Sequence, residues 1–113
     1  MEQHFRYITV PKDKNAAVAL DYDTAKPEQL IEWKLTNDEF MELWNLQVFD
    51  KINSDCDTII DDYEDESITE KERLNQCFLI VNEISNKENG SVKRFSEMVK
   101  TAIDLKTGLY FYF

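Results

Sequence analysis

The chain has 113 residues, 42% of them hydrophobic, which is enough for one domain with a buried core. Its formal net charge of −10 argues against nucleic acid or an anionic membrane as a direct partner. The apolar runs are too short to span a bilayer, residues 1–10 do not resemble a secretion signal, and two cysteines make no disulfide framework. We therefore expect a single cytoplasmic domain over residues 1–113 with reduced thiols.

The N-terminal third of the sequence favours strands. Near-alternating β-branched and aromatic residues predict a strand over 4–10, and the turn-forming residues PKDKN follow it. Residues 16–22 are expected to return as the second strand of a hairpin. The segment KPEQLIEWKL has two interpretations, because Pro27 suits the first turn of a short helix whereas LIEWKL suits a strand.

Two Thr-x-x-Glu capping boxes mark expected helix starts. The box at 36–39 predicts a helix from about residue 37, and the box at 69–72 predicts a helix that runs to about 86. Leu46 and Phe49 lie off the main apolar stripe of the first helix, so it is apolar around most of its circumference. That helix is therefore either central or presents a second face to a partner.

The C-terminal part predicts one more helix and one more strand. Gly90 is expected to end the preceding helix in a left-handed conformation, and Ser91 is expected to cap the next one. Gly108 should end that helix, and LYFYF closes the chain as an apolar strand. Together these elements predict an α+β fold: three or four helices packed on a small, mostly antiparallel sheet formed by an N-terminal hairpin and the C-terminal strand.

The segment DCDTIIDDYEDES, residues 55–67, carries seven carboxylates and no positive charge. Residues 50–72 hold ten acids and two bases, a net charge of −8, whereas the other 90 residues hold 13 acids and 11 bases, a net charge of −2. If residues 52–66 form a helix, the wheel places every carboxylate towards solvent. The apolar residues share the opposite face: Ile52, Cys56, Ile59, Ile60 and Tyr63.

Two explanations of this acidic segment remain open. One is a solvated face that keeps the protein soluble. The other is a surface for a cationic partner, favoured because like charges at i,i+4 on a helix cost about 0.2–0.5 kcal/mol per pair. A calcium loop starting at Asp61 fits poorly, because Tyr63 takes a ligand position and Glu66 takes the position that requires glycine.

Residues for catalysis or cofactor binding are scarce. The single histidine is His4, near the N-terminus, and both Cys56 and Cys77 lie on apolar stripes. Two glycines cannot build a phosphate-binding loop, and there is no Cys/His set for zinc. We therefore expect a protein that is not an enzyme and that carries no metal or cofactor.

A compact acidic chain with a local carboxylate cluster resembles the bacterial immunity proteins that neutralise polymorphic toxins, including those of contact-dependent growth inhibition systems. The resemblance implies a monomer that binds a cognate basic toxin domain, a nuclease, and does not bind nucleic acid itself. Changing Asp57, Asp61, Asp62 and Asp65 to asparagine is expected to weaken that binding and leave folding intact. The expected partner-binding residues are Asp55, Asp57, Asp61, Asp62, Tyr63, Glu64, Asp65 and Glu66.

Two other binding functions compete with this one. A nucleic-acid-mimicking protein directed against host or restriction enzymes also presents carboxylates, but spreads them along an elongated surface, whereas here they crowd into one stretch. If the chain is instead an adaptor subunit, its partner would cover Leu46 and Phe49, and the binding of that partner would depend little on salt concentration.

Overall fold

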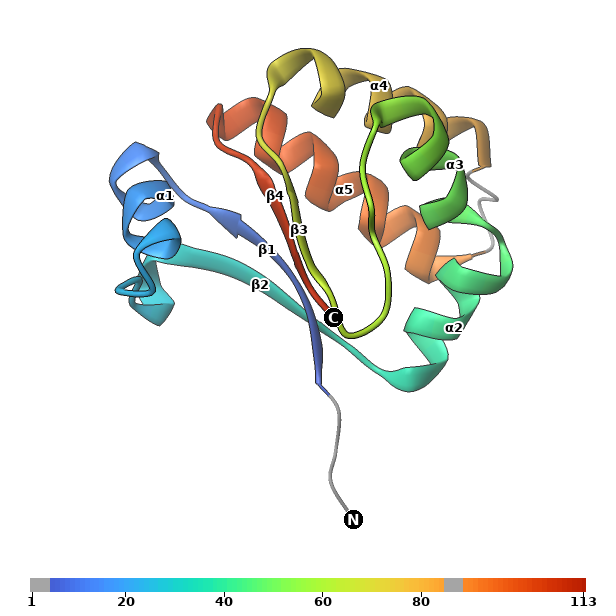
Figure 1. Cartoon of the computed structure of the whole chain (residues 1–113), viewed down its shortest axis with the longest axis horizontal. Helices are drawn as coiled ribbons and strands as arrows, with labels where there is room; N and C mark the ends of the chain where they lie inside the picture. The colour runs from blue at the N-terminus through green and yellow to red at the C-terminus, as the bar shows by residue number, and fades with distance from the viewer. Residues whose placement is uncertain (1–4, 85–88) are drawn as a thin grey trace.

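The computed structural model describes residues 5–84 and 89–113, which form an α+β fold of four strands and five α-helices (Figure 1). The strand order is β2-β1-β4-β3, and every neighbouring pair is antiparallel. The expected fold class is confirmed. In chain order the elements are β1 (Arg6–Pro11), α1 (Lys14–Asp21), the 3-10 helix η1 (Pro27–Gln29), β2 (Leu30–Leu35), α2 (Asn37–Asn45), α3 (Val48–Cys56), β3 (Asp65–Ile68), α4 (Lys71–Ile84), α5 (Gly90–Leu105) and β4 (Leu109–Tyr112).

The helices cover the two faces of the sheet unequally. Helices α2 to α5 lie on one side of the sheet, and α1 with η1 lies on the other side near one end (Figure 1). Alternate strand residues point into the layer between the sheet and α2–α5. One row of this inner face joins Trp33, Ile8 and Phe111 across three strands, and all three side chains are buried. Much of the opposite face, called the outer face below, lies outside the main core.

Phe49 lies at the centre of an aromatic cluster in the core. Its side chain is 1% exposed, and five neighbouring rings have centroids 5.3–6.4 Å from its own. Of the two alternatives for this apolar region, the central one is confirmed for Phe49, and the one in which a partner covers Phe49 is wrong. The helix that contains it breaks at Gln47, which adopts φ 60°, and this left-handed residue turns α3 so that Phe49 faces inward.

Residues 16–21 are helical and Tyr22 caps the helix, so the strand predicted over 16–22 is wrong. Asp13 caps α1, since its carboxylate accepts a hydrogen bond of 2.7 Å from the N–H of Ala16, and an alanine-rich stretch follows. The partner of β1 in the hairpin is β2, with Ile8 opposite Trp33. Both interpretations of KPEQLIEWKL apply, because Pro27 begins η1 and LIEWKL forms β2.

The capping box at Thr36 and Glu39 is confirmed at the start of α2. The predictions for Gly90 and Ser91 are wrong, because Asn89 caps α5 by accepting hydrogen bonds of 3.1 Å from the N–H groups of Ser91 and Val92. Gly90 is the first residue of α5, and its φ is not positive. Helix α4 is described as far as Ile84. The last two residues of the predicted helix, 85 and 86, lie outside the described residues. His4, the first residue of the strand predicted over 4–10, also lies outside them, and Phe5 is described but precedes β1.

Gly108 packs where a side chain does not fit. A Cβ atom there would lie 2.9 Å from Thr69 Cγ2 and 3.2 Å from the backbone oxygen of Ile68. We expect Gly108→Ala to lower the free energy of unfolding by about 1–3 kcal/mol, because β4 or the turn before α4 must move. Urea unfolding measures the change.

Gly90→Ala is the matched control, because nothing lies within 4 Å of a Cβ atom at Gly90. In the first turn of α5 this change should leave stability unchanged or raise it by about 0.5–1 kcal/mol. Equal effects of the two substitutions would contradict the close packing at Gly108.

Candidate acidic interface

The acidic segment is an extended loop and a strand after Cys56, so the helix considered over 52–66 is correct for 52–56 and wrong beyond. Helix α3 ends at Cys56, and Asp57 adopts the left-handed φ of 54° that stops it. Residues 57–64, called the acidic loop below, lead into β3, which pairs with β4. Aspartate is a poor helix former and repels its neighbours on a helix, and β3 gains a hydrogen-bonded partner instead.

Asn53 holds the acidic loop against α3. Its amide nitrogen donates to the backbone oxygen of Ile60 at 2.9 Å, and its amide oxygen accepts from the N–H of Ile60 and the hydroxyl of Thr58, both at 2.7 Å. The side chain of Ile60 is 3% exposed and anchors the loop in the core. Asn53 and Ile60, neither of them acidic, therefore hold the first half of the loop in place.

Two of the expected solvent-facing carboxylates are bonded inside the protein. Arg6 donates two hydrogen bonds of 2.9 Å to Asp62, one to each carboxylate oxygen, and its guanidinium lies over the ring of Phe40. The hydrogen bonds that Arg6 donates to Asp62 raise the pKa of Arg6 above its usual value. Glu66 accepts from the N–H of Ile59 at 2.8 Å. Asp62 and Glu66 therefore position the loop, and the prediction that every carboxylate faces solvent is wrong for these two.

The other five carboxylates of the predicted segment are exposed. The side chain of Asp57 is 97% exposed and lies 3.8 Å from Arg73, a pair that contributes little in water. Two large apolar residues stand among them, Ile59 at 75% exposure and Tyr63 at 74%. The exposed carboxylates belong to Asp55, Asp57, Asp61, Glu64 and Asp65.

The outer face of the sheet brings in acids that the sequence did not single out. Strand pairing places Asp65 beside Tyr112 and Ser67 beside Tyr110. The end of α1 reaches the same place, since the hydroxyl of Tyr110 donates to Asp21 at 3.3 Å. A shallow hollow of about 190 Å³ lies here, lined by residues of β3 and β4.

Asp21 and Asp23 were missed because residues 16–22 were interpreted as a strand. The sequence signal for these two acids is their position at the end of a helix. That helix is predicted only if Asp13 is recognised as its N-cap. Glu32 lies on the same face, because Thr9 pairs with both Glu32 and Tyr110. We call Asp21, Asp23, Glu32 and Asp65 the acidic sheet face.

The acids of this face act on Tyr112. Burial, and after it Tyr110, Asp65, Asp23 and Asp21 in that order of effect, together raise the pKa of Tyr112 to about 12. The fold therefore favours the neutral phenol. This contribution to stability is complete below the unfolded pKa of about 10 and is lost as the pH rises through the folded value.

Tyr112→Phe is expected to resist alkaline unfolding better than the wild type between about pH 10 and 12, since it has no phenol to ionise. Circular dichroism recorded against pH measures the alkaline unfolding of each protein. The difference in phenolate absorbance between wild type and Tyr112→Phe gives the pKa of Tyr112. Tyr22→Phe is the control, because Tyr22 is 75% exposed. If both variants follow the wild-type alkaline curve, the acids do not act on Tyr112 as described.

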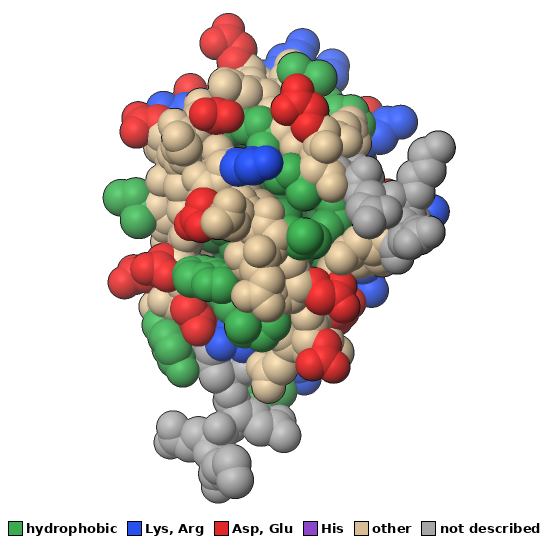
Figure 2. All heavy atoms as spheres, turned by 90° about the vertical axis from the view of Figure 1, so that its right-hand side faces the viewer, with side chains coloured by type: hydrophobic (Ala, Val, Ile, Leu, Met, Phe, Trp, Pro, Cys, Tyr) green, Lys and Arg blue, Asp and Glu red, His purple; other side chains and the backbone are tan. Residues whose placement is uncertain are grey.

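The helical side of the molecule carries acids in a different arrangement. Figure 2 shows the side on which α2, α3 and α4 lie, where acidic side chains are separated by hydrophobic and uncharged ones. Interspersed charges of this kind are typical of a solvated surface. The acidic loop and the acidic sheet face differ from this helical side. In the acidic loop the carboxylates follow one another along the chain, and on the acidic sheet face they converge from separate elements.

The described residues offer little for catalysis. Cys56 and Cys77 are buried, and burial raises the pKa of both thiols, which disfavours the reactive thiolate. Within residues 5–84 and 89–113, no group of three or more His, Cys, Asp and Glu side chains is arranged to hold a metal ion. In the same ranges no helix has the length and apolar character needed to cross a membrane.

Comparison with known proteins gives a structural likeness. No protein-family model matches the sequence, and no curated protein matches it. The chain is similar in structure to the Neisseria DNA mimic protein DMP12, with a TM-score of 0.64 and 17% sequence identity. The likeness covers 97% of this chain and 100% of that chain. At this identity it shows a shared fold.

Proposed function

We propose that this chain is a DNA mimic, which binds the DNA-binding surface of a basic protein and competes there with DNA. The observation that carries the proposal is the path of the exposed carboxylates. They follow the extended acidic loop into β3 and continue onto the acidic sheet face through Asp21 and Asp23. Basic DNA-binding surfaces are built to attract such rows of negative charge.

The extended path removes the argument against mimicry. Residues on a helix advance about 1.5 Å each, so acids on one helix would crowd together. In a strand each residue advances about 3.3 Å, and neighbouring side chains alternate between faces. Acids of the loop, of β3 and of α1 are thus spread over a surface that several elements form, as a duplex spreads its phosphates.

Charge and likeness support the same function. A net charge of −10 speeds the encounter with a cationic partner, to on-rates of about 10⁸–10⁹ M⁻¹s⁻¹ at low salt. The similar protein DMP12 is named a DNA mimic, and it shares the fold over nearly all of this chain. On this proposal the protein has no catalytic role, and DNA is its competitor for the partner.

A second candidate is the immunity protein, an inhibitor of one cationic toxin nuclease. Ile59 and Tyr63 favour it, because both are largely exposed on the acidic loop. Charge mimicry alone does not require exposed apolar side chains, whereas a specific protein interface uses them as anchors. Both candidates place the acidic loop against a cationic surface.

Capture of the partner separates the two candidates. The tagged protein is incubated with lysate of the source cell at low salt, and bound proteins are eluted either with duplex DNA or with salt. Elution of a DNA-binding protein by duplex DNA supports mimicry. A captured nuclease whose activity on DNA or RNA stops in the complex supports the immunity function. Recovery of no basic protein at low salt contradicts both.

A further inference from the structure

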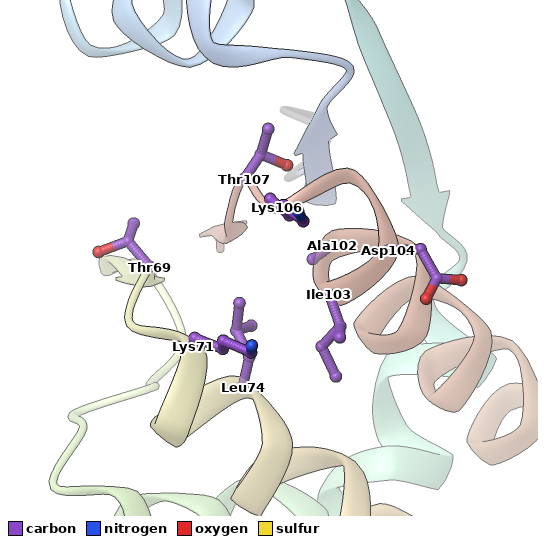
Figure 3. A pocket seen from close by; sticks show the side chains of 8 residues that line it. All are labelled: Thr69, Lys71, Leu74, Ala102, Ile103, Asp104, Lys106 and Thr107. Atoms are coloured by element: carbon purple, nitrogen blue, oxygen red, sulfur yellow. The ribbon is translucent and has the colours of Figure 1, made fainter.

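A second cavity lies away from the acidic loop and has the opposite electrostatic character. It has a volume of about 470 Å³, within the range of about 300–1,000 Å³ that is usual for ligand sites. Its wall comes from the start of α4 and the end of α5 (Figure 3). Leu74 and Ile103 point into the space from the two helices, and Ala102 lies behind them.

The charged residues that line this cavity are two lysines and one aspartate, Asp104. Lys71 and Lys106 stand at its rim on different elements, and neither forms an ion pair with a described residue. Asp104 also lines the cavity, and its carboxylate lies on the side of α5 that faces away from Leu74 (Figure 3). The hydroxyl of Thr107 donates to the backbone oxygen of Pro11 at 2.7 Å, so it is already used within the fold.

Both lysines occupy positions where another residue is better for folding. Lys106 adopts φ 57° after α5, a left-handed conformation that glycine accepts without strain. Lys71 is the first residue of α4, where the positive end of the helix dipole disfavours a cation. An anion between the two ammonium groups would offset both costs.

We propose that this cavity binds a small organic anion with an apolar tail, of the class of medium-chain carboxylates. The anionic head lies between Lys71 and Lys106, and the tail packs on Leu74 and Ile103. The chain as a whole repels anions, but at physiological salt charges beyond about 8 Å are largely screened, so the lining, with two lysines against one aspartate, sets the local charge. The site shares no residue with the acidic loop or the acidic sheet face, so it stands independently of the proposed DNA mimicry.

Sodium octanoate is the probe, added to isotope-labelled protein while amide NMR shifts are recorded. We expect saturable shifts at Leu74, Ala102 and Thr107 with a Kd of about 1 mM. Octanol, which lacks the charge, and acetate, which lacks the tail, should each bind more weakly. Absence of saturable shifts, or equal binding of octanol and octanoate, overturns the proposal.

Variants test the lysines without loss of the fold. Lys106→Gly should bind octanoate about three- to tenfold more weakly. The same variant should melt about 2–4 °C higher, because glycine relieves the left-handed conformation. Lys71→Gln should weaken binding by a similar factor, and Lys100→Gln, on the exposed face of α5, should leave it unchanged. Unaltered binding in the Lys71→Gln, Lys106→Gly double variant overturns the proposal.

Discussion

Phe49→Ala is expected to lower the free energy of unfolding by about 3–5 kcal/mol, the range for truncation of a buried aromatic residue. The ring is 1% exposed and packs against Phe40, Phe95 and Phe113 among its neighbours. A domain of this size is stable by about 5–15 kcal/mol, so the variant loses a large share of its stability. Urea unfolding followed by circular dichroism measures the loss.

Leu46→Ala is the matched control, two residues before the start of α3 and 42% exposed. It should change the free energy of unfolding by no more than about 0.5–1 kcal/mol. Similar small effects of both substitutions would mean that Phe49 is not central. They would restore the interpretation in which this helical region presents a second apolar face to a partner subunit.

The second large effect concerns partner binding. The triple variant Asp57→Asn, Asp61→Asn, Asp65→Asn should fold normally and bind its basic partner about a hundredfold more weakly at low salt, roughly 2.7 kcal/mol. All three side chains are exposed, and asparagine at 61 still offers an oxygen to the N–H of residue 62, as Asp61 does at 2.8 Å. Isothermal titration calorimetry at two salt concentrations measures the loss.

Asp62 is left unchanged in this variant. It was expected to belong to the neutralised set, but its two hydrogen bonds to Arg6 make Asp62→Asn a test of folding instead. The charge-matched control is Glu83→Gln, Glu97→Gln, Asp104→Asn on α4 and α5, which should retain wild-type affinity. An equal loss in both triple variants would show that only net charge matters and that the acidic loop is not the interface.

Local signals in the sequence predict the fold well where backbone groups are hydrogen-bonded by residues a few positions away. The capping box at Thr36 and Glu39 works because both hydrogen bonds lie within four residues. The apolar strand at the C-terminus and the inward stripe of α5 follow from spacing alone. The strand at 16–22 failed because PKDKN was interpreted as a turn, although Asp13 in it caps a helix.

The acidic site was predicted in composition but not in geometry. The partner of Asp62 is Arg6, 56 positions away, and no local pattern connects them. Asp21 reaches β4 only through the packing of α1 on the sheet, which the sequence does not encode in any spacing. The helical wheel therefore predicted exposure correctly for five of the seven carboxylates, but the helix it assumed is wrong for the six that follow Cys56.

Competition with DNA for the captured partner tests the central claim most directly. A labelled duplex is bound to that partner, and its fluorescence anisotropy is followed as the wild-type chain or the Asp57, Asp61, Asp65 triple variant is added. DNA mimicry predicts that the wild type releases the duplex at one chain per binding site, less effectively as salt rises, and that the triple variant requires about a hundredfold more protein. A stable ternary complex in which the duplex stays bound would contradict the claim.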